Sequence, residues 1–286
     1  MGLRNWARAR IVRFMTKSVA HYHHYGHNDF EALRKHIRKG DVLLVEGDQR
    51  VSVVIKYLTQ SSWSHAALYV GDELVRRGGE LAAFALESFG DDAHDLIVEA
   101  LYDGVVAAPI DKYLDFNVRL CRPHQLRAEH LRIILDDAIE SIGWRYDLRN
   151  MLELALRLPL ESLLPGRFRL EDRRLGSGVA SAVICTSLLG RLFRKVRFPV
   201  LPTVSFPEKE QVPVAHKRRF GLFLRRRRRA RGVYRPRHPT LITPRDFDVS
   251  PYFEIVKFNV IGNRDFDYID IRWADELPEE AGQPES

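Results

Sequence analysis

Three polar side chains with complementary chemistry stand in otherwise apolar stretches of this sequence: Cys185, His65 and Glu99. A thiolate is a nucleophile, an imidazole is a common base for activating it, and a carboxylate can orient the imidazole by accepting one ring N–H. Together the three would attack an acyl carbon and form a thioester. We therefore expect Cys185 to be a nucleophile, His65 its base, and Glu99 the residue that holds the histidine.

Each of the three also has a simpler interpretation when taken alone. A free cysteine on an apolar helix stripe is most often a packed core residue, and a single histidine in an apolar strand is most often a hydrogen-bonded core residue. Glu99 would point to water if its strand lay at a sheet edge. Asp72 and His94 compete with Glu99 for the orienting role, although both fall in predicted turns.

The expected positions of the three residues favour the chemical interpretation. Cys185 follows Ser181, a suitable N-cap, near the start of a predicted helix, and a helix N-terminus lowers the pKa of a thiol. Backbone N–H groups at this helix start, including that of Cys185, are candidate oxyanion donors. His65 shares a strand face with Ala67, which is small enough to let a helix approach. A carboxylate inside the apolar segment 97–101 needs a partner such as an imidazole N–H.

Hydrophobic periodicity predicts the elements that must position these residues. An Asp-Gly turn at Asp103-Gly104 between two apolar runs predicts a hairpin. Residues 72–95 form a longer insertion with a helical stretch at 81–86. The predicted helices are 29–39, 51–58, 128–142, 147–156 and 181–196, and the predicted strands are 41–47, 64–70, 96–101, 104–110, 117–121 and 252–260. This mixture predicts an α+β fold.

Composition and charge limit the possible classes of protein. Only two cysteines occur in 286 residues, which argues against a disulfide framework, and we interpret Cys121 as a packing residue. No apolar run is long enough to span a membrane, and the N-terminus lacks the pattern of a signal peptide, so we expect a cytoplasmic protein. The four histidines of 21–27 are a weak metal motif, and we interpret them as a linker. We expect no cofactor and no metal.

Positive charge is concentrated in two segments. Residues 1–20 and 211–245 together carry 17 of the 45 Lys and Arg and no Asp or Glu, so the remainder has 28 basic against 38 acidic side chains. Such appendages favour an anionic partner. A basic helix at 3–20 either lies on a membrane surface or packs on the domain with its arginines in solvent, and the simplest interpretation of the arginine-rich stretch is a solvated loop. Nucleic acid is not favoured, because no nucleic-acid motif accompanies the arginines. The expected contacts with an anionic inner-membrane surface are Arg4, Arg8, Arg13, Lys17 and Arg225–Arg229.

The ordered set of motifs resembles a known family. Its members are the permuted papain-like amidases of the YaeF/YiiX type, which are relatives of the NlpC-type cell-wall peptidases and of the lecithin–retinol acyltransferase-like enzymes. The resemblance covers roughly residues 38–195, and the order His, Glu, Cys is the one that a circular permutation produces. It is carried by Gly40–Leu44, Ser64–Gly71, Val98–Ala100, Gly143–Asp147 and Ile184–Leu188.

The resemblance implies a circularly permuted papain-like (NlpC-type) fold, in which an antiparallel sheet packs against helices that include the nucleophile helix. It implies Cys185 as nucleophile, His65 as base and Glu99 as third residue, with Tyr146 lining the site, and we add Trp63 and Tyr69 as substrate-binding candidates. The implied substrate is a peptide-like amide or a lipid ester. The alternative is an inactive module that binds a membrane or nucleic acid through its Arg-rich loop. The predicted organisation is 1–27 as a basic helix and linker, 28–198 as the catalytic domain, 199–260 as an extension and 261–286 as a tail.

Overall fold

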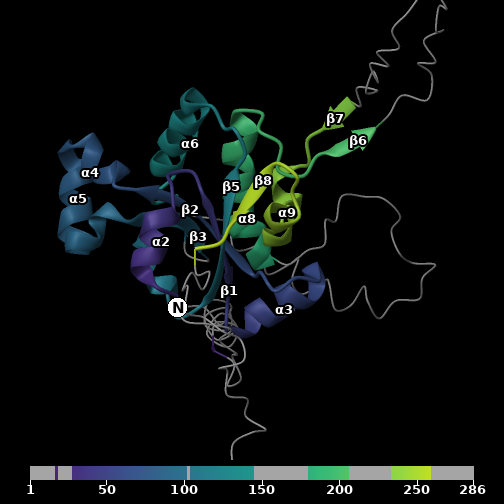
Figure 1. Cartoon of the computed structure of the whole chain (residues 1–286), viewed down its shortest axis with the longest axis horizontal. Helices are drawn as coiled ribbons and strands as arrows, with labels where there is room; N and C mark the ends of the chain where they lie inside the picture. Colours follow the sequence, from purple (N-terminus) through teal and green to yellow (C-terminus); the bar gives the residue numbers. More distant parts are fainter. Residues whose placement is uncertain (1–16, 19–27, 102–103, 145–179, 206–232, 259–286) are drawn as a thin grey trace, which may run out of the picture.

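A six-stranded antiparallel sheet organises the described part of the chain (Figure 1). The structure is a computed structural model, and it describes residues 17–18, 28–101, 104–144, 180–205 and 233–258. The strand order is β4-β3-β2-β1-β5-β8. The strands are β1 (Val42–Glu46), β2 (His65–Gly71), β3 (Leu96–Leu101), β4 (Gly104–Pro109), β5 (Asn117–Pro123) and β8 (Phe253–Val256).

Helices surround this sheet, which confirms the expected α+β class. The α-helices are α2 (Phe30–His36), α3 (Arg50–Thr59), α4 (Glu73–Arg77), α5 (Gly79–Phe89), α6 (Ala128–Glu140), α8 (Ala180–Lys195) and α9 (Pro244–Asp248). Short 3₁₀ turns are η1 (Gly90–His94), η2 (Ile110–Tyr113) and η4 (Pro239–Leu241). Figure 1 shows α4 and α5 together at one side and a small ribbon of β6 (Thr203–Ser205) and β7 (Val233–Arg235) at the other.

The two faces of the sheet have separate apolar cores, because side chains alternate along each strand. On one face, Ala66 and Leu68 of β2 pack in the same core as Leu188, Leu189 and Leu192 of α8. On the other face, Ala67 and Tyr69 of β2 pack in a core with Leu33 and Ile37 around α2 and with Ile110 and Tyr113 of η2. We call these the α8 face and the α2 face.

Helix α8 is held on its face by a close approach of η4. A Cβ atom added to Gly190 would lie 2.7 Å from Ile242 Cδ1 and 3.2 Å from Pro239 Cα, so the helix approaches η4 closely at this glycine. Thr186 also donates its hydroxyl to the carbonyl of Ile242. These contacts fix α8 against the sheet, where it packs on β2 and β3.

Most predicted elements are present, with shifted boundaries. The hairpin at Asp103-Gly104 is confirmed by the pairing of β3 with β4. The insertion 72–95 contains two helices and a 3₁₀ turn where only one helical stretch was predicted. Strand β8, predicted within a C-terminal extension, pairs with β5 as the edge strand of the same sheet. The predicted helix 147–156, residues 1–16, the histidine cluster 21–27, Tyr146 and Arg225–Arg229 lie outside the described residues.

Candidate active site

His65 and Glu99 meet on the α2 face of the sheet. Val45 of β1 is opposite His65, and Val98 of β3 is opposite Leu68, so the pleat directs His65 and Glu99 to the same side. His65 Nε2 lies 2.5 Å from Glu99 Oε2. They are 34 positions apart in the sequence, with α4, α5 and η1 between them, and the adjacent pairing of β2 and β3 brings the two side chains together.

The Glu99 carboxylate is fully buried and accepts from three donors. Besides His65, the Tyr113 hydroxyl donates to Oε2 at 2.6 Å and Lys112 Nζ donates to Oε1. Burial alone would raise the pKa of Glu99, but the hydrogen bond and charge of His65 and the charge and hydrogen bond of Lys112 outweigh it and hold that pKa at about 2. Glu99 is therefore ionised at neutral pH.

An ionised carboxylate fixes which nitrogen of the His65 ring carries the proton. Such a carboxylate can only accept hydrogen bonds, so Nε2 must be the donor in the contact with Glu99. In the neutral ring, Nδ1 is then the basic nitrogen. The His65 side chain is 18% exposed, whereas the carboxylate behind it is fully buried. The pair thus has the orientation that a general base requires.

Helix α8, which contains Cys185, packs on the opposite face of the sheet. Its described core side chains Leu188 and Leu189 belong to the α8 face. Side chains of α8 are described from Thr186 onward, so the position of the Cys185 thiol stays a prediction. A thiol on this helix can reach His65 only around the end of β2, where His65 is the first residue of the strand.

The N-terminal part of α8 is directed toward that end of the sheet. Arg191 donates to Asp137 Oδ2 and to Ser141 Oγ, both at 2.6 Å, and Lys195 donates to Asp137 Oδ1 at 2.8 Å. Toward its N-terminus α8 therefore runs toward the C-terminal end of α6. The segment after α6 binds the start of β4, since Gly143 N–H donates to the Val105 carbonyl at 2.8 Å. At the start of β4, β3 ends and β2 begins.

The expected oxyanion donors at the helix start need correction. Helix α8 is described from Ala180, so the predicted cap Ser181 lies inside the helix and Cys185 follows at least five helical residues. Only the first four N–H groups of a helix lack an intrahelical acceptor. The N–H of Cys185 therefore donates to a carbonyl within the helix. Hydrogen-bond donors for an oxyanion would have to come from other residues.

The two aromatic substrate-binding candidates already have polar partners of their own. Trp63 is buried, and its Nε1–H donates to Asp248 Oδ2 at 3.1 Å. Tyr69 is buried on the α2 face, four residues or about 13 Å along β2 from His65, and its hydroxyl donates to Asp95 Oδ1 at 2.7 Å. Their role toward a substrate stays a prediction, as does that of Tyr146.

The competing orienting residues lie elsewhere. Asp72 forms an ion pair with Lys39, and His94 ends η1 and lines a hollow that also includes Asp72, whereas neither has a described contact with His65. Cys121 is fully buried on the α8 face, and burial raises the pKa of its thiol to about 12. The interpretation of Cys121 as a packing residue agrees with this environment.

Sequence reasoning missed Lys112 and Tyr113, which complete the surroundings of Glu99. They lie in η2, directly after β4, where the only sequence signal is a charged residue next to an aromatic one in Ile110-Asp111-Lys112-Tyr113. Nothing in that pattern connects them with Glu99. Their contact with it depends on the β3–β4 hairpin, which returns the chain to the side of Glu99.

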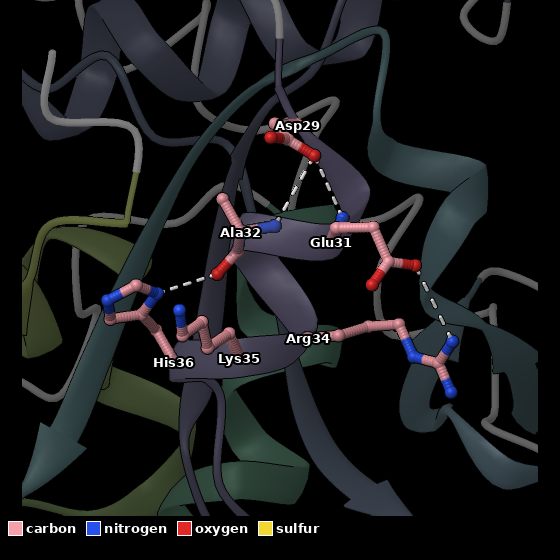
Figure 2. Close-up of a pocket in the computed structure, with 6 residues that line it drawn as sticks. All are labelled: Asp29, Glu31, Ala32, Arg34, Lys35 and His36. Carbon is pink, nitrogen blue, oxygen red and sulfur yellow. Dashed lines mark hydrogen bonds and ion pairs between the residues drawn. The ribbon is translucent and has the colours of Figure 1, made fainter. Parts of the chain in front are cut away.

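A hollow on the surface runs along α2 and does not include the His65 site (Figure 2). It is about 640 Å³ and open to solvent. Its polar groups largely bind one another: Asp29 caps the helix by accepting from the N–H groups of Glu31 and Ala32, and His36 Nδ1 contacts the Ala32 carbonyl at 2.7 Å. We therefore interpret it as helix surface.

The described residues hold no grouping of three or more His, Cys, Asp or Glu side chains suited to a metal ion. In the same part of the chain, no helix combines the length and the apolar character needed to cross a membrane.

Comparisons with known proteins find similarity among solved structures only. No family model matches the chain, and no curated protein matches it. A solved structure described as the metalloprotein yiiX from Escherichia coli O157:H7, DUF1105, is similar over 77% of this chain and 96% of its own, with 13% identity and a TM-score of 0.41. A similarity at this level does not indicate the chemistry of the protein.

Proposed function

We propose that this protein is a cysteine-dependent hydrolase or acyltransferase with a permuted papain-like arrangement. In this proposal the Cys185 sulfur attacks the acyl carbon of an amide or ester, and His65 accepts the thiol proton at Nδ1. The amine or alcohol leaves with that proton, and a thioester remains on Cys185. Water or a second acceptor, deprotonated by His65, then releases the acyl group and regenerates the thiol.

The single observation that carries the proposal is the contact between His65 Nε2 and the buried Glu99 carboxylate at 2.5 Å. A histidine that only filled core space would not need an ionised, fully buried carboxylate behind it, because burying a charge is costly. The same arrangement directs the basic nitrogen of the ring away from Glu99. It is the geometry of a general base whose partner lies on the other side of the ring.

Alkylation of the two cysteines tests the assignment of the nucleophile. At pH 6 an ordinary thiol with a pKa of about 8.5 is less than about 1% thiolate, whereas an activated cysteine still reacts. We expect iodoacetamide to label Cys185 at pH 6, and a His65→Gln variant to lose at least about tenfold in labelling rate. Mass spectrometry of the peptides separates Cys185 from Cys121.

Cys121 provides the internal control. Its thiol is fully buried with a raised pKa, so it should stay unlabelled in the folded protein. Labelling that survives Cys185→Ala, or that occurs on Cys121, would show that Cys185 is not the nucleophile. A supporting result would be an acyl adduct on Cys185 after incubation with an activated ester.

The substrate class in this proposal is a peptide-like amide or a lipid ester, and one surface favours the lipid. Helix α3 exposes Val53, Val54 and Tyr57, and α3 contacts α8. The start of α3 contacts one basic residue of the N-terminal segment, since Arg50 N–H donates to the Lys17 carbonyl at 3.0 Å. An apolar helix face beside basic residues suits an anionic membrane surface.

Sedimentation with vesicles tests the lipid form. We expect binding to anionic vesicles that weakens at high salt and that falls when Tyr57 is replaced by Ser, with neutral vesicles as the control. Equal binding to neutral and anionic vesicles would show that attraction between basic residues and anionic lipids does not bring the protein to the membrane. Salt-dependent DNA binding by a protein without a reactive Cys185 would instead favour a non-catalytic binding module.

A further inference from the structure

Lys112 and Tyr113 reach Glu99 from a 3₁₀ turn that is anchored at both ends. Ile110 and Tyr113 are three residues apart, so they share one side of η2, and both are buried in the core of the α2 face. Ile110 N–H donates to the Asp95 carbonyl at 3.0 Å. Beyond the turn, the buried Asn28 donates to the carbonyls of Leu114 and Phe116 at 2.7 and 2.6 Å.

The two side chains also contact each other, and the Tyr113 ring lies near that of His65. Lys112 Nζ lies 4.9 Å from the centre of the Tyr113 ring, which attracts a cation. The Tyr113 ring lies 6.0 Å from the His65 ring and 5.7 Å from that of Phe116. Lys112 is therefore held between an aromatic ring and a carboxylate, although its side chain is 36% exposed.

The two carboxylate oxygens of Glu99 accept hydrogen bonds from different donors. Oε1 accepts from Lys112, while Oε2 accepts from both Tyr113 and His65. Lys112 supplies the counter-charge that makes an ionised carboxylate tolerable at full burial. The Tyr113 hydroxyl fixes the rotation of the carboxylate, since the oxygen that it binds is the one that faces the imidazole. Without both, the carboxylate has no fixed orientation toward His65.

We propose that Lys112 and Tyr113 are positioning residues of the active site, which clamp Glu99 so that it holds His65 with the proton on Nε2 and the basic nitrogen turned toward the nucleophile. This inference rests on the proposed function, because it assigns a role within the same site. Neither residue is proposed to contact a substrate. Lys112 acts on His65 through Glu99, and so does the Tyr113 hydroxyl, while the Tyr113 ring also lies near the His65 ring.

Nuclear magnetic resonance of the histidine rings tests the clamp without any substrate. In ¹⁵N-histidine-labelled protein, we expect a sharp Nε2–H signal for His65, assigned by its absence from His65→Gln. The signal should broaden or disappear in Tyr113→Phe, which removes only the hydroxyl, and in Lys112→Met, which removes the charge and the hydrogen bond that Lys112 donates to Glu99. Lys112→Arg should retain it, because arginine also donates to a carboxylate with full charge.

An exposed neighbour in the same turn provides the matched control. Asp111→Asn changes a charge in η2 without touching Glu99 and should leave the His65 signal unchanged. In the variants that lose the signal, Cys185 alkylation should slow by about tenfold, the effect expected for a lost charge-assisted hydrogen bond. Far-ultraviolet circular dichroism and the remaining histidine signals show whether each variant is folded.

The outcomes separate the two proposals. A His65 signal that is unchanged in both Tyr113→Phe and Lys112→Met would overturn the clamp, whatever the reactivity of Cys185. A signal that is lost as expected in a protein whose wild-type Cys185 is no more reactive than an ordinary thiol would overturn the proposed function while leaving the clamp in place. If Tyr113→Phe fails to fold, the comparison of Lys112→Met with Lys112→Arg still decides the question.

Discussion

Replacing Glu99 by glutamine isolates the contribution of its charge, because the two side chains have nearly the same size. The carboxylate accepts from His65, Lys112 and Tyr113. A glutamine offers one accepting oxygen and one NH₂ group, so at least one donor would face another donor. We therefore expect Glu99→Gln to lower the stability of the protein and to change the orientation of the His65 ring.

The magnitude follows from the pKa of Glu99, which is held at about 2 instead of the usual 4.5. A difference of this size corresponds to about 3 kcal/mol of stabilisation by the ionised form at neutral pH. Because the folded-state pKa lies below the unfolded-state value, this stabilisation is fully present above about pH 4.5 and is lost as the pH falls through about 2. At pH 3 roughly 1 kcal/mol of it should remain.

Urea unfolding followed by circular dichroism measures the effect. We expect Glu99→Gln to be less stable than the wild type by about 3 kcal/mol at pH 7 and by about 1 kcal/mol at pH 3, with an unchanged urea dependence. Glu87→Gln, at an exposed position of α5, is the control and should change stability by less than about 0.5 kcal/mol. A destabilisation equally large at both pH values would refute the reasoning, since it would come from packing and not from the ionised carboxylate.

Two further substitutions test the framework that holds the site. Gly190→Ala should destabilise the protein by about 1–3 kcal/mol in urea unfolding, because the added methyl group would lie 2.7 Å from Ile242 Cδ1 and 3.2 Å from Pro239 Cα, so both must shift. Ser88→Ala, on an exposed helix surface, is its control, and equal stability of Gly190→Ala would show that η4 shifts at no cost. Arg122→Met should cost about 3–5 kcal/mol, because it leaves the buried Asp41 carboxylate without the guanidinium that donates to both of its oxygens at 2.9 and 2.7 Å; a change in melting temperature of less than about 2 °C would contradict this.

The sequence predicted the strands around the site well because their apolar runs are short and bounded by clear turn signals. The run 41–47 precedes Asp48 and follows Gly40, and the run 64–70 ends at Gly71. The structure places β1 within the first run, and β2 covers the second from His65 and extends by one residue to Gly71. The pairing of His65 with Glu99 also had a sequence signal, since a carboxylate in an apolar strand requires a partner and a histidine in a neighbouring strand can provide it.

Other features had no local signal. Strand β8 pairs with β5, although their residues are more than a hundred positions apart. Apolar periodicity does not predict which strands pair with one another. The contacts of Lys112 and Tyr113 depend on that same tertiary arrangement. The helix predicted at 181–196 agrees with α8 to one residue, but Ser181, a good capping residue by type, lies inside the helix and does not cap it.

The position of His65 in its strand decides whether a residue on α8 can use it. His65 lies on the α2 face, and α8 packs on the other, so a histidine deeper in β2, for example at the position of Ala67, would be separated from α8 by the sheet itself. His65 is instead the first residue of the strand, where the sheet does not separate it from α8. Its side chain is 18% exposed, while its carboxylate partner is fully buried. The proposed chemistry therefore requires a histidine at the end of a strand, where one ring nitrogen faces the core and the other faces the edge of the sheet.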